Sequence, residues 1–194
     1  MRQYPKALVL LLAAGTALAC TAGESKSTPG NVESDVAQAA GPLDACALTL
    51  KGDIDAAFAP RVFGEGEKGV GDVAGSATLA AVSRCSFISR GASVKEMMTV
   101  SVLARRAPND QTSVTVAIAK DGAVQLNATP IDVPGLGDAA YWINLGSSTR
   151  PSIQLNVLKG KRLWLIFGAT ASPLETDAAL TGLTQVAKAT LGRL

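Results

Sequence analysis

Hydrophobic and polar residues alternate with a period of two along several stretches of the chain, which is typical of half-buried β-strands. The alternation is clearest where Met98, Val100 and Val102 are separated by single polar residues. Nearer the C-terminus, two apolar runs flank Lys159-Gly160, and this pattern predicts a β-hairpin. Its second run is apolar on both faces, which predicts a central or doubly covered strand. Strands are predicted within residues 77–89, 96–106, 152–158 and 162–169.

Two other segments have the period of an amphipathic helix. In the first, Leu50, Ile54 and Phe58 fall on one face, and Thr49 is placed to cap a short helix. At the end of the chain, residues 172–175 form a capping box, with proline at the first helical position. Strands grouped ahead of a terminal helix predict an α+β domain: an antiparallel sheet packed by a short N-terminal helix and a longer C-terminal helix. The apolar side of the longer helix is formed by Leu180, Leu183, Ala187 and Leu194.

The segment 110–124 fits two interpretations. Residues from Val114 to Ile118 alternate as in a strand, and Asp121-Gly122 is a common hairpin turn. Asp110, however, is a residue type that caps helices. The period alone favours a strand.

Residues 1–19 have the composition of a signal peptide. Arg2 and Lys6 precede an apolar run that is too short to span a bilayer core of about 30 Å. Two processing routes are open: ordinary secretion after cleavage at a small residue, or lipidation of Cys20. The residues before Cys20 are similar to a bacterial lipobox, with Ala17 where that motif usually has leucine.

The cysteine count bears on this choice. The chain contains Cys20, Cys46 and Cys85, and an odd number of thiols is unfavourable in an oxidising compartment. Lipidation of Cys20 leaves an even pair, whereas simple secretion leaves Cys20 free or paired with another molecule. We therefore expect a lipid anchor at Cys20 and a disulfide between Cys46 and Cys85. In an organism with two membranes, the protein would face the periplasm from the outer membrane.

Residues 20–43 are poor in large apolar residues and rich in small and polar ones, which predicts a lipidated flexible tether. A single domain then extends over 44–194. The chain has 18 basic and 16 acidic residues, and the excess of two is accounted for by Arg2 and Lys6 in the predicted leader. The mature chain is neutral and has no cluster of basic and aromatic residues, so we expect no nucleic-acid partner.

Glycines at 133–142 raise the question of a nucleotide site. Gly135, Gly137 and Ala140 have the spacing of a dinucleotide-binding fingerprint. That fingerprint needs a long helix starting at the glycines and an acidic residue about 20 positions later, and the chain has no acid there. A related sequence at 64–69 carries two glutamates, which would repel a pyrophosphate. We expect glycine turns with positive φ and no bound nucleotide.

Catalysis is restricted because the chain contains no histidine. This excludes Ser-His-Asp triads, Cys-His pairs and histidine-liganded metal sites. The acid pairs Asp53/Asp55 and Glu65/Glu67 are close in sequence only, because residues i and i+2 of a helix do not face each other. We expect no catalytic residue, metal or cofactor.

The order of these features resembles an uncharacterised family of small bacterial envelope lipoproteins. The resemblance rests on Cys46 in a first helix, Cys85 in a first strand, the turn at 133–142, the hairpin at Gly160 and a last helix. It covers nearly the whole mature chain. The resemblance implies that the two cysteines pair and that the segment 110–124 is a helix.

Two functions fit these observations. The first is a non-catalytic binding or interaction module, anchored in the membrane, for a protein or another envelope component. The second is a carrier of an apolar small molecule, held near Trp142, Trp164 and Ile166.

Overall fold

The structure of the protein is a computed structural model that describes residues 43–69, 72, 74, 80–90, 97–107, 112–147, 151–160, 162–171 and 175–194. The predicted signal peptide, the lipidation candidate Cys20 and nearly all of the predicted tether lie outside these residues. Within the described part of the chain, no helix is long and apolar enough to cross a membrane.

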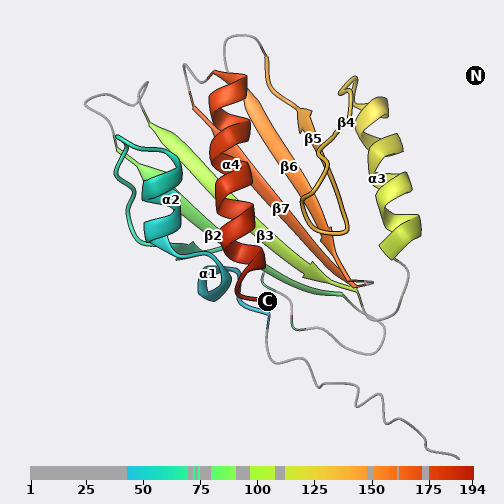
Figure 1. The fold of residues 1–194 in the computed structure, drawn as a ribbon, viewed down its shortest axis with the longest axis horizontal. Coiled ribbons are helices and arrows are strands. Elements are labelled where there is room, and N and C mark those ends of the chain that lie inside the picture. Colours follow the sequence, from blue (N-terminus) through green and yellow to red (C-terminus); the bar gives the residue numbers. More distant parts are fainter. Residues whose placement is uncertain are drawn as a thin grey trace, which may run out of the picture. The chain divides into compact units, whose positions relative to one another are not determined.

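An antiparallel sheet forms the centre of the domain, with strands in the order β1-β2-β3-β7-β6-β5-β4 (Figure 1). The helices are short near the N-terminus and longest at the C-terminus, so the predicted α+β class is confirmed. The strands are β1 (Glu67–Lys68), β2 (Ala81–Ser89), β3 (Met98–Arg106), β4 (Ile131–Asp132), β5 (Ala139–Asn144), β6 (Ser152–Lys159) and β7 (Leu163–Thr170). The helices are α1 (Ala45–Leu48), α2 (Lys51–Ala57), α3 (Thr112–Gln125) and α4 (Thr176–Leu191).

One face of the sheet, called here the first face, carries the main hydrophobic core. Helix α4 lies along the strands over β6 and β7, and α1 packs on β2 and β3 (Figure 1). The alternation in β3 places Met98, Val100 and Val102 in this core with no exposed surface, as the sequence predicts. Strand β7 is the fourth of the seven strands, which explains why its sequence is apolar on both faces.

Helices α2 and α4 pack closely because one helical position has no side chain. A Cβ at Gly182 of α4 would lie 2.5 Å from a ring carbon of Phe58, at the end of α2. The two regions are also joined by a buried hydrogen bond of 3.1 Å between the hydroxyls of Thr49 and Thr190. The interface between the N-terminal helices and α4 therefore depends on small and hydroxyl-bearing residues.

The opposite, second face of the sheet has a smaller apolar cluster at one side. Residues of β5, β6 and β7 form it together with the end of α3, which lies beside β4 in Figure 1. The segment 110–124 is thus largely helical, as the resemblance implied and against its period. The buried members of this second-face cluster are Ala123, Ala128, Tyr141, Ile143, Leu158 and Trp164.

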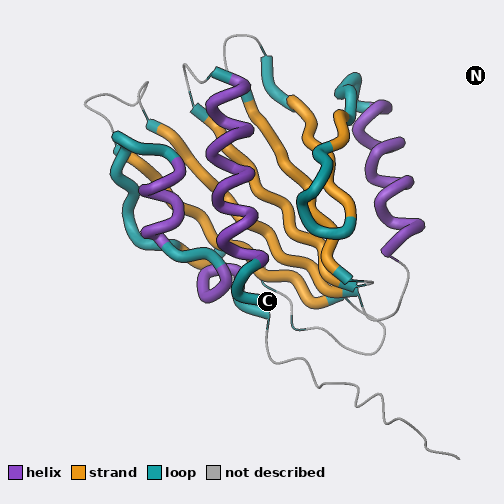
Figure 2. The backbone as a smooth tube through the Cα atoms, viewed as in Figure 1, coloured by secondary structure: helices purple, strands orange, loops and turns teal. Residues whose placement is uncertain are grey.

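The turn between β4 and β5 contains the glycines that resemble a nucleotide-binding loop. Gly135 and Gly137 have φ angles of +74° and +62°, as expected, and a strand rather than a long helix follows them. Figure 2 shows this loop folding back over the sheet beside α4. Leu136, between the two glycines, is 3% exposed and packs in the first-face core. The glycines therefore shape a loop that inserts a leucine into the core.

Two helix starts differ from the sequence prediction. Thr49 does not cap a helix through its side chain, which is buried against Thr190. Instead, the Leu50 amide at the start of α2 donates to the Asp53 carboxylate at 3.2 Å. Helix α4 begins at Thr176 after Glu175, so Glu175 precedes the helix instead of occupying its third position. The serine and proline of the predicted capping box lie outside the described residues.

Candidate functional site

Strand pairing places the second-face side chains in rows across the sheet. One row begins with Glu67 of the edge strand β1 and continues through Ser86, Ser101, Gly168 and Gln154, from β2, β3, β7 and β6. The next row towards one end of the strands contains Thr99, Thr170 and Ser152, and the row on the other side contains Arg84, Leu103, Ile166 and Asn156. The middle of this face is therefore a band of small polar side chains bordered by apolar ones.

These rows surround a hollow of about 340 Å³, the second-face hollow. Gly168 lies in its polar row, where a Cβ would come within 2.9 Å of the Ser101 hydroxyl oxygen. Because Gly168 has no side chain, the surface of β7 is depressed between the side chains of β3 and β6. The hollow is lined by Arg84, Ser86, Ser101, Leu103, Ser152, Ile153, Gln154, Ile166, Gly168, Ala169 and Thr170.

Hydroxyl groups provide most of the hydrogen-bonding capacity of the second-face hollow. Those of Ser86, Ser101, Ser152 and Thr170 have no hydrogen-bond partner among the described residues. A hydroxyl can both donate and accept, so this surface suits a ligand that carries both kinds of group.

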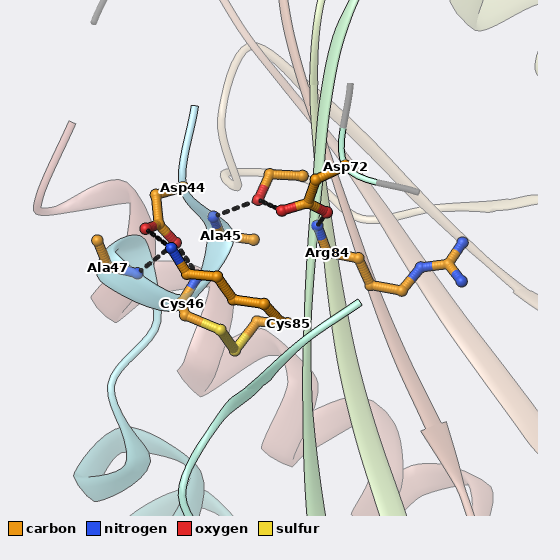
Figure 3. Close-up of polar contacts among 9 residues, drawn as sticks. Asp44, Ala45, Cys46, Ala47, Asp72, Arg84 and Cys85 are labelled. Carbon is orange, nitrogen blue, oxygen red and sulfur yellow. Dashed lines mark hydrogen bonds and ion pairs between the residues drawn. A yellow bond between two sulfur atoms is a disulfide. The ribbon is translucent and has the colours of Figure 1, made fainter. Parts of the chain in front are cut away.

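Arg84 supplies the charge at the edge of the hollow. Its backbone amide donates to the Asp72 carboxylate at 2.9 Å, and its exposed side chain extends away from that contact (Figure 3). The guanidinium makes no ion pair with another described residue. Arg84 is the one charged side chain among the lining residues, and Glu67 of β1 lies on the same face beside Ser86, with which it pairs.

A buried amide lies beside the hollow, in the row that contains Ile166. The Gln154 side-chain nitrogen donates to Asn156 Oδ1 at 3.0 Å. Asn156 is 1% exposed, and its own Nδ2 has no hydrogen-bond partner. A buried donor without a partner costs about 1–3 kcal/mol, so this pair is held in place at an energetic cost.

The disulfide predicted between Cys46 and Cys85 is present and joins α1 to β2 (Figure 3). Both ends of the bond are supported by hydrogen bonds. Asp44 accepts from the Cys46 and Ala47 amides at 3.0 and 3.2 Å. The Ala45 amide donates to the Ser83 hydroxyl, which donates in turn to the Asp72 carboxylate. This network ties the first described helix to the edge of the sheet.

Charged partners around this network shift two pKa values. The Lys68 ammonium lies 2.6 Å from the Asp44 carboxylate. The hydrogen bond from Lys68 and those from the α1 amides lower the pKa of Asp44, against the effect of burial. The same contact with Asp44 raises the pKa of Lys68. These groups stabilise the start of the domain and face no described cavity.

The residues predicted as an apolar binding surface are not brought together. Trp142 pairs with Leu155 and packs on the first-face core. Trp164 and Ile166 are on the second face. Trp164 pairs with Leu158 of the second-face cluster, and Ile166 pairs with Asn156 in one of the rows described above. Ile166 lines the second-face hollow, whereas Trp164 is buried beside Leu158. The sheet thus separates Trp142 from the other two side chains.

Both acids of the predicted pair Asp53/Asp55 have structural partners. Asp53 forms an ion pair of 2.7 Å with Arg193, and Asp55 is paired with Lys51. The hydrogen bond from Lys51 and that from the Phe63 amide lower the pKa of Asp55. Glu67 lies in the edge strand β1. Across the described residues, no group of three or more potential ligands could hold a metal ion.

Sequence reasoning missed the second-face hollow. The polar positions of the strands are visible as alternation, but alternation marks only a solvent-facing side. Which of these side chains become neighbours depends on the pairing of β3 with β7, two strands far apart in the sequence. A glycine inside the apolar run of β7 was the only available sign of a close approach.

Comparisons with known proteins leave the family open. No protein-family model matches the chain. A search of curated proteins also finds no significant match.

Proposed function

We propose that the chain is an exported lipoprotein of the bacterial envelope whose domain is a non-catalytic binding module. The second-face hollow is the observation that carries the binding role. It presents free hydroxyls, an amide and one guanidinium on a face that α3 covers only at one side.

Export is supported by the N-terminal sequence and by the disulfide. Residues 1–19 have the composition of a signal peptide, and Cys20 follows a sequence similar to a lipobox. The bond between Cys46 and Cys85 is typical of proteins in oxidising compartments outside the cytoplasm.

The non-catalytic role is supported by the chemistry of the hollow. Its serines and threonine would need a general base to act as nucleophiles. The lining residues include no carboxylate or amine, and the chain contains no histidine. Binding through hydrogen bonds is the use that these groups allow directly.

The alternative role as an apolar carrier has less support. The three side chains that suggested it lie on two faces of the sheet. The apolar residues of the second-face cluster are packed against α3, and the hollow beside them is lined mainly by polar groups. A hydrogen-bonding partner fits this surface better than an apolar molecule does.

A photo-crosslinking experiment in native membranes tests the proposal. A photoreactive side chain replaces Ser101 in the full chain, and a matched control places it at Gln185, which is exposed on α4. We expect a discrete adduct from position 101 and none from position 185. Equal labelling from both positions, or none from either, would contradict a binding role for the second face.

A further inference from the structure

We propose that the second-face hollow binds a hydroxylated carboxylate, the chemistry of a sugar acid. This inference rests on the proposed function, because it names the ligand of the same surface. Three properties of the hollow carry it: its charge, its hydrogen-bonding groups and its shape.

The charge of the second face favours a singly charged anion. Arg84 is the one charged side chain among the lining residues. Arg105 is on the same face in the adjoining row, and the second-face positions of β2, β3, β6 and β7 include no acid. Glu67 of β1 pairs with Ser86 and is therefore on this face too, so Arg84 and Arg105 give two positive charges against one negative charge. A guanidinium binds a carboxylate through two parallel hydrogen bonds, and one such group matches one negative charge. A phosphate dianion would require more positive charge than the hollow itself supplies.

The hydrogen-bonding groups favour a ligand that carries several hydroxyls. Four hydroxyls without partners, on Ser86, Ser101, Ser152 and Thr170, each can donate and accept. Gln154 uses one N–H on Asn156 and retains a second N–H and its carbonyl oxygen. A ligand with only a carboxylate would leave most of these groups to water.

The shape of the hollow suits a small ring. Its volume of about 340 Å³ is near the lower end of the range of ligand pockets, about 300–1,000 Å³. Gly168 keeps the surface low, and Leu103 and Ile166 border it with apolar surface. A sugar ring has C–H groups that pack on such side chains while its hydroxyls face the polar row.

Calorimetry on the full chain, purified from membranes in detergent, tests this inference. The probes are D-glucuronate, D-glucose, inorganic phosphate and polygalacturonate. We expect glucuronate or polygalacturonate to bind, with glucose and phosphate at least about tenfold weaker. If only polygalacturonate binds, the ligand is a glycan chain. If glucuronate and polygalacturonate bind with equal affinity per sugar unit, the ligand is a free sugar acid.

Two variants locate the site. Arg84→Gln should weaken binding by about tenfold or more, since a hydrogen-bonded charge pair is lost. This change leaves the fold intact, because only the backbone amide of Arg84 contacts Asp72. Gly168→Ala should also weaken binding by placing a methyl group in the hollow. The control Lys188→Gln removes the same charge from α4, on the other side of the sheet, and should change the affinity by less than about twofold.

The inference fails if neither acidic probe binds, if phosphate binds as tightly with the same dependence on Arg84, or if Lys188→Gln has the same effect as Arg84→Gln. These results are separate from the test of the proposed function. An adduct at Ser101 without binding of either acidic probe leaves the binding module standing and rejects the sugar acid.

Discussion

Gly137 is the most constrained position of the turn ahead of β5. Its φ is +62°, and a Cβ there would lie 2.4 Å from the Leu158 carbonyl oxygen. Gly135, two residues earlier, also has positive φ, but a Cβ there would meet open space. The two glycines therefore separate the cost of backbone conformation from the cost of a close contact.

We expect Gly137→Ala to destabilise the domain more than Gly135→Ala does. A left-handed conformation costs a residue with a Cβ about 1–2 kcal/mol, which applies to both variants. Gly137→Ala must also displace Leu158 and the strand that carries it. Urea denaturation measures both free energies of unfolding. Equal losses would show that the loop moves freely away from β6.

Tyr141 is a second residue whose environment has a measurable consequence. It is 3% exposed in the second-face cluster, and burial raises its pKa to about 12. The ordinary pKa of tyrosine is about 10, so the unfolded chain ionises before the folded one does. The stabilising effect of the neutral phenol is complete below pH 10 and is lost as the pH rises towards 12.

We therefore expect the free energy of unfolding to fall between pH 10 and 12, and Tyr141→Phe to reduce this fall. Urea denaturation from pH 8 to 11 measures the free energy of unfolding of both proteins. Subtracting one profile from the other removes the contribution of the lysines, which both proteins share. Parallel pH profiles for the two proteins would mean that the phenol reaches solvent in the folded state.

At the scale of elements, the disulfide joins a helix of four residues to the edge region of the sheet. A helix this short has no independent stability, so α1 depends on its tertiary contacts. The bond closes a separation of 39 residues between Cys46 and Cys85. β1 lies beside it, because a Cβ at Gly66 would come within 2.7 Å of the Cys85 sulfur.

Replacing both cysteines by alanine should lower the free energy of unfolding by about 2–5 kcal/mol. Most of this loss comes from the greater freedom of the unfolded chain. Chemical denaturation measures it, and reduction of the unaltered protein should reproduce it. A loss below about 1 kcal/mol would show that Asp44, Ser83 and Asp72 hold α1 in place without the bond.

The start of α1 also has a predicted pH dependence. Because the pKa of Asp44 is lowered in the folded protein, its charge stabilises the domain above pH 3.8, and this effect is lost as the pH falls through the folded value. Asp44→Asn keeps an acceptor for the helix amides and removes only the charge. Its difference from the unaltered protein should therefore shrink as the pH falls below 3.8 and disappear once Asp44 is protonated in the folded protein. A difference that does not shrink at all as the pH falls below 3.8 would assign the effect to the hydrogen bonds.

The elements show which parts of the fold the sequence determines locally. The alternation in β3 and the turn at Gly160 specify a strand and a hairpin within a few residues. Segment 110–124 has the period of a strand, yet residues 112–125 form α3, whose end packs in the second-face cluster through Ala123. The second-face hollow cannot be predicted from local sequence, because Ser101 and Gln154 lie on either side of Gly168 only through pairing between strands that are distant in the sequence.

At the scale of the whole molecule, the proposed anchor and the proposed binding surface belong to separate parts of the sequence. The lipid would be attached at Cys20, whereas the second face is built from strands of the domain. A variant that loses the anchor should therefore retain the fold and the hollow. This independence makes the anchor testable by localisation alone.

We expect Cys20→Ser to move the protein from the membrane fraction to the soluble fraction. Stable anchoring needs two or more acyl chains, and a bacterial lipoprotein carries them all on this one cysteine. Washing membranes with salt and then with detergent measures the distribution. The matched control replaces Cys46 and Cys85 by serine, which removes two thiols and leaves Cys20, and it should remain in the membrane fraction. If Cys20→Ser also stayed in the membrane fraction until detergent was added, the lipid would not be the anchor, and an uncleaved leader would be the remaining explanation.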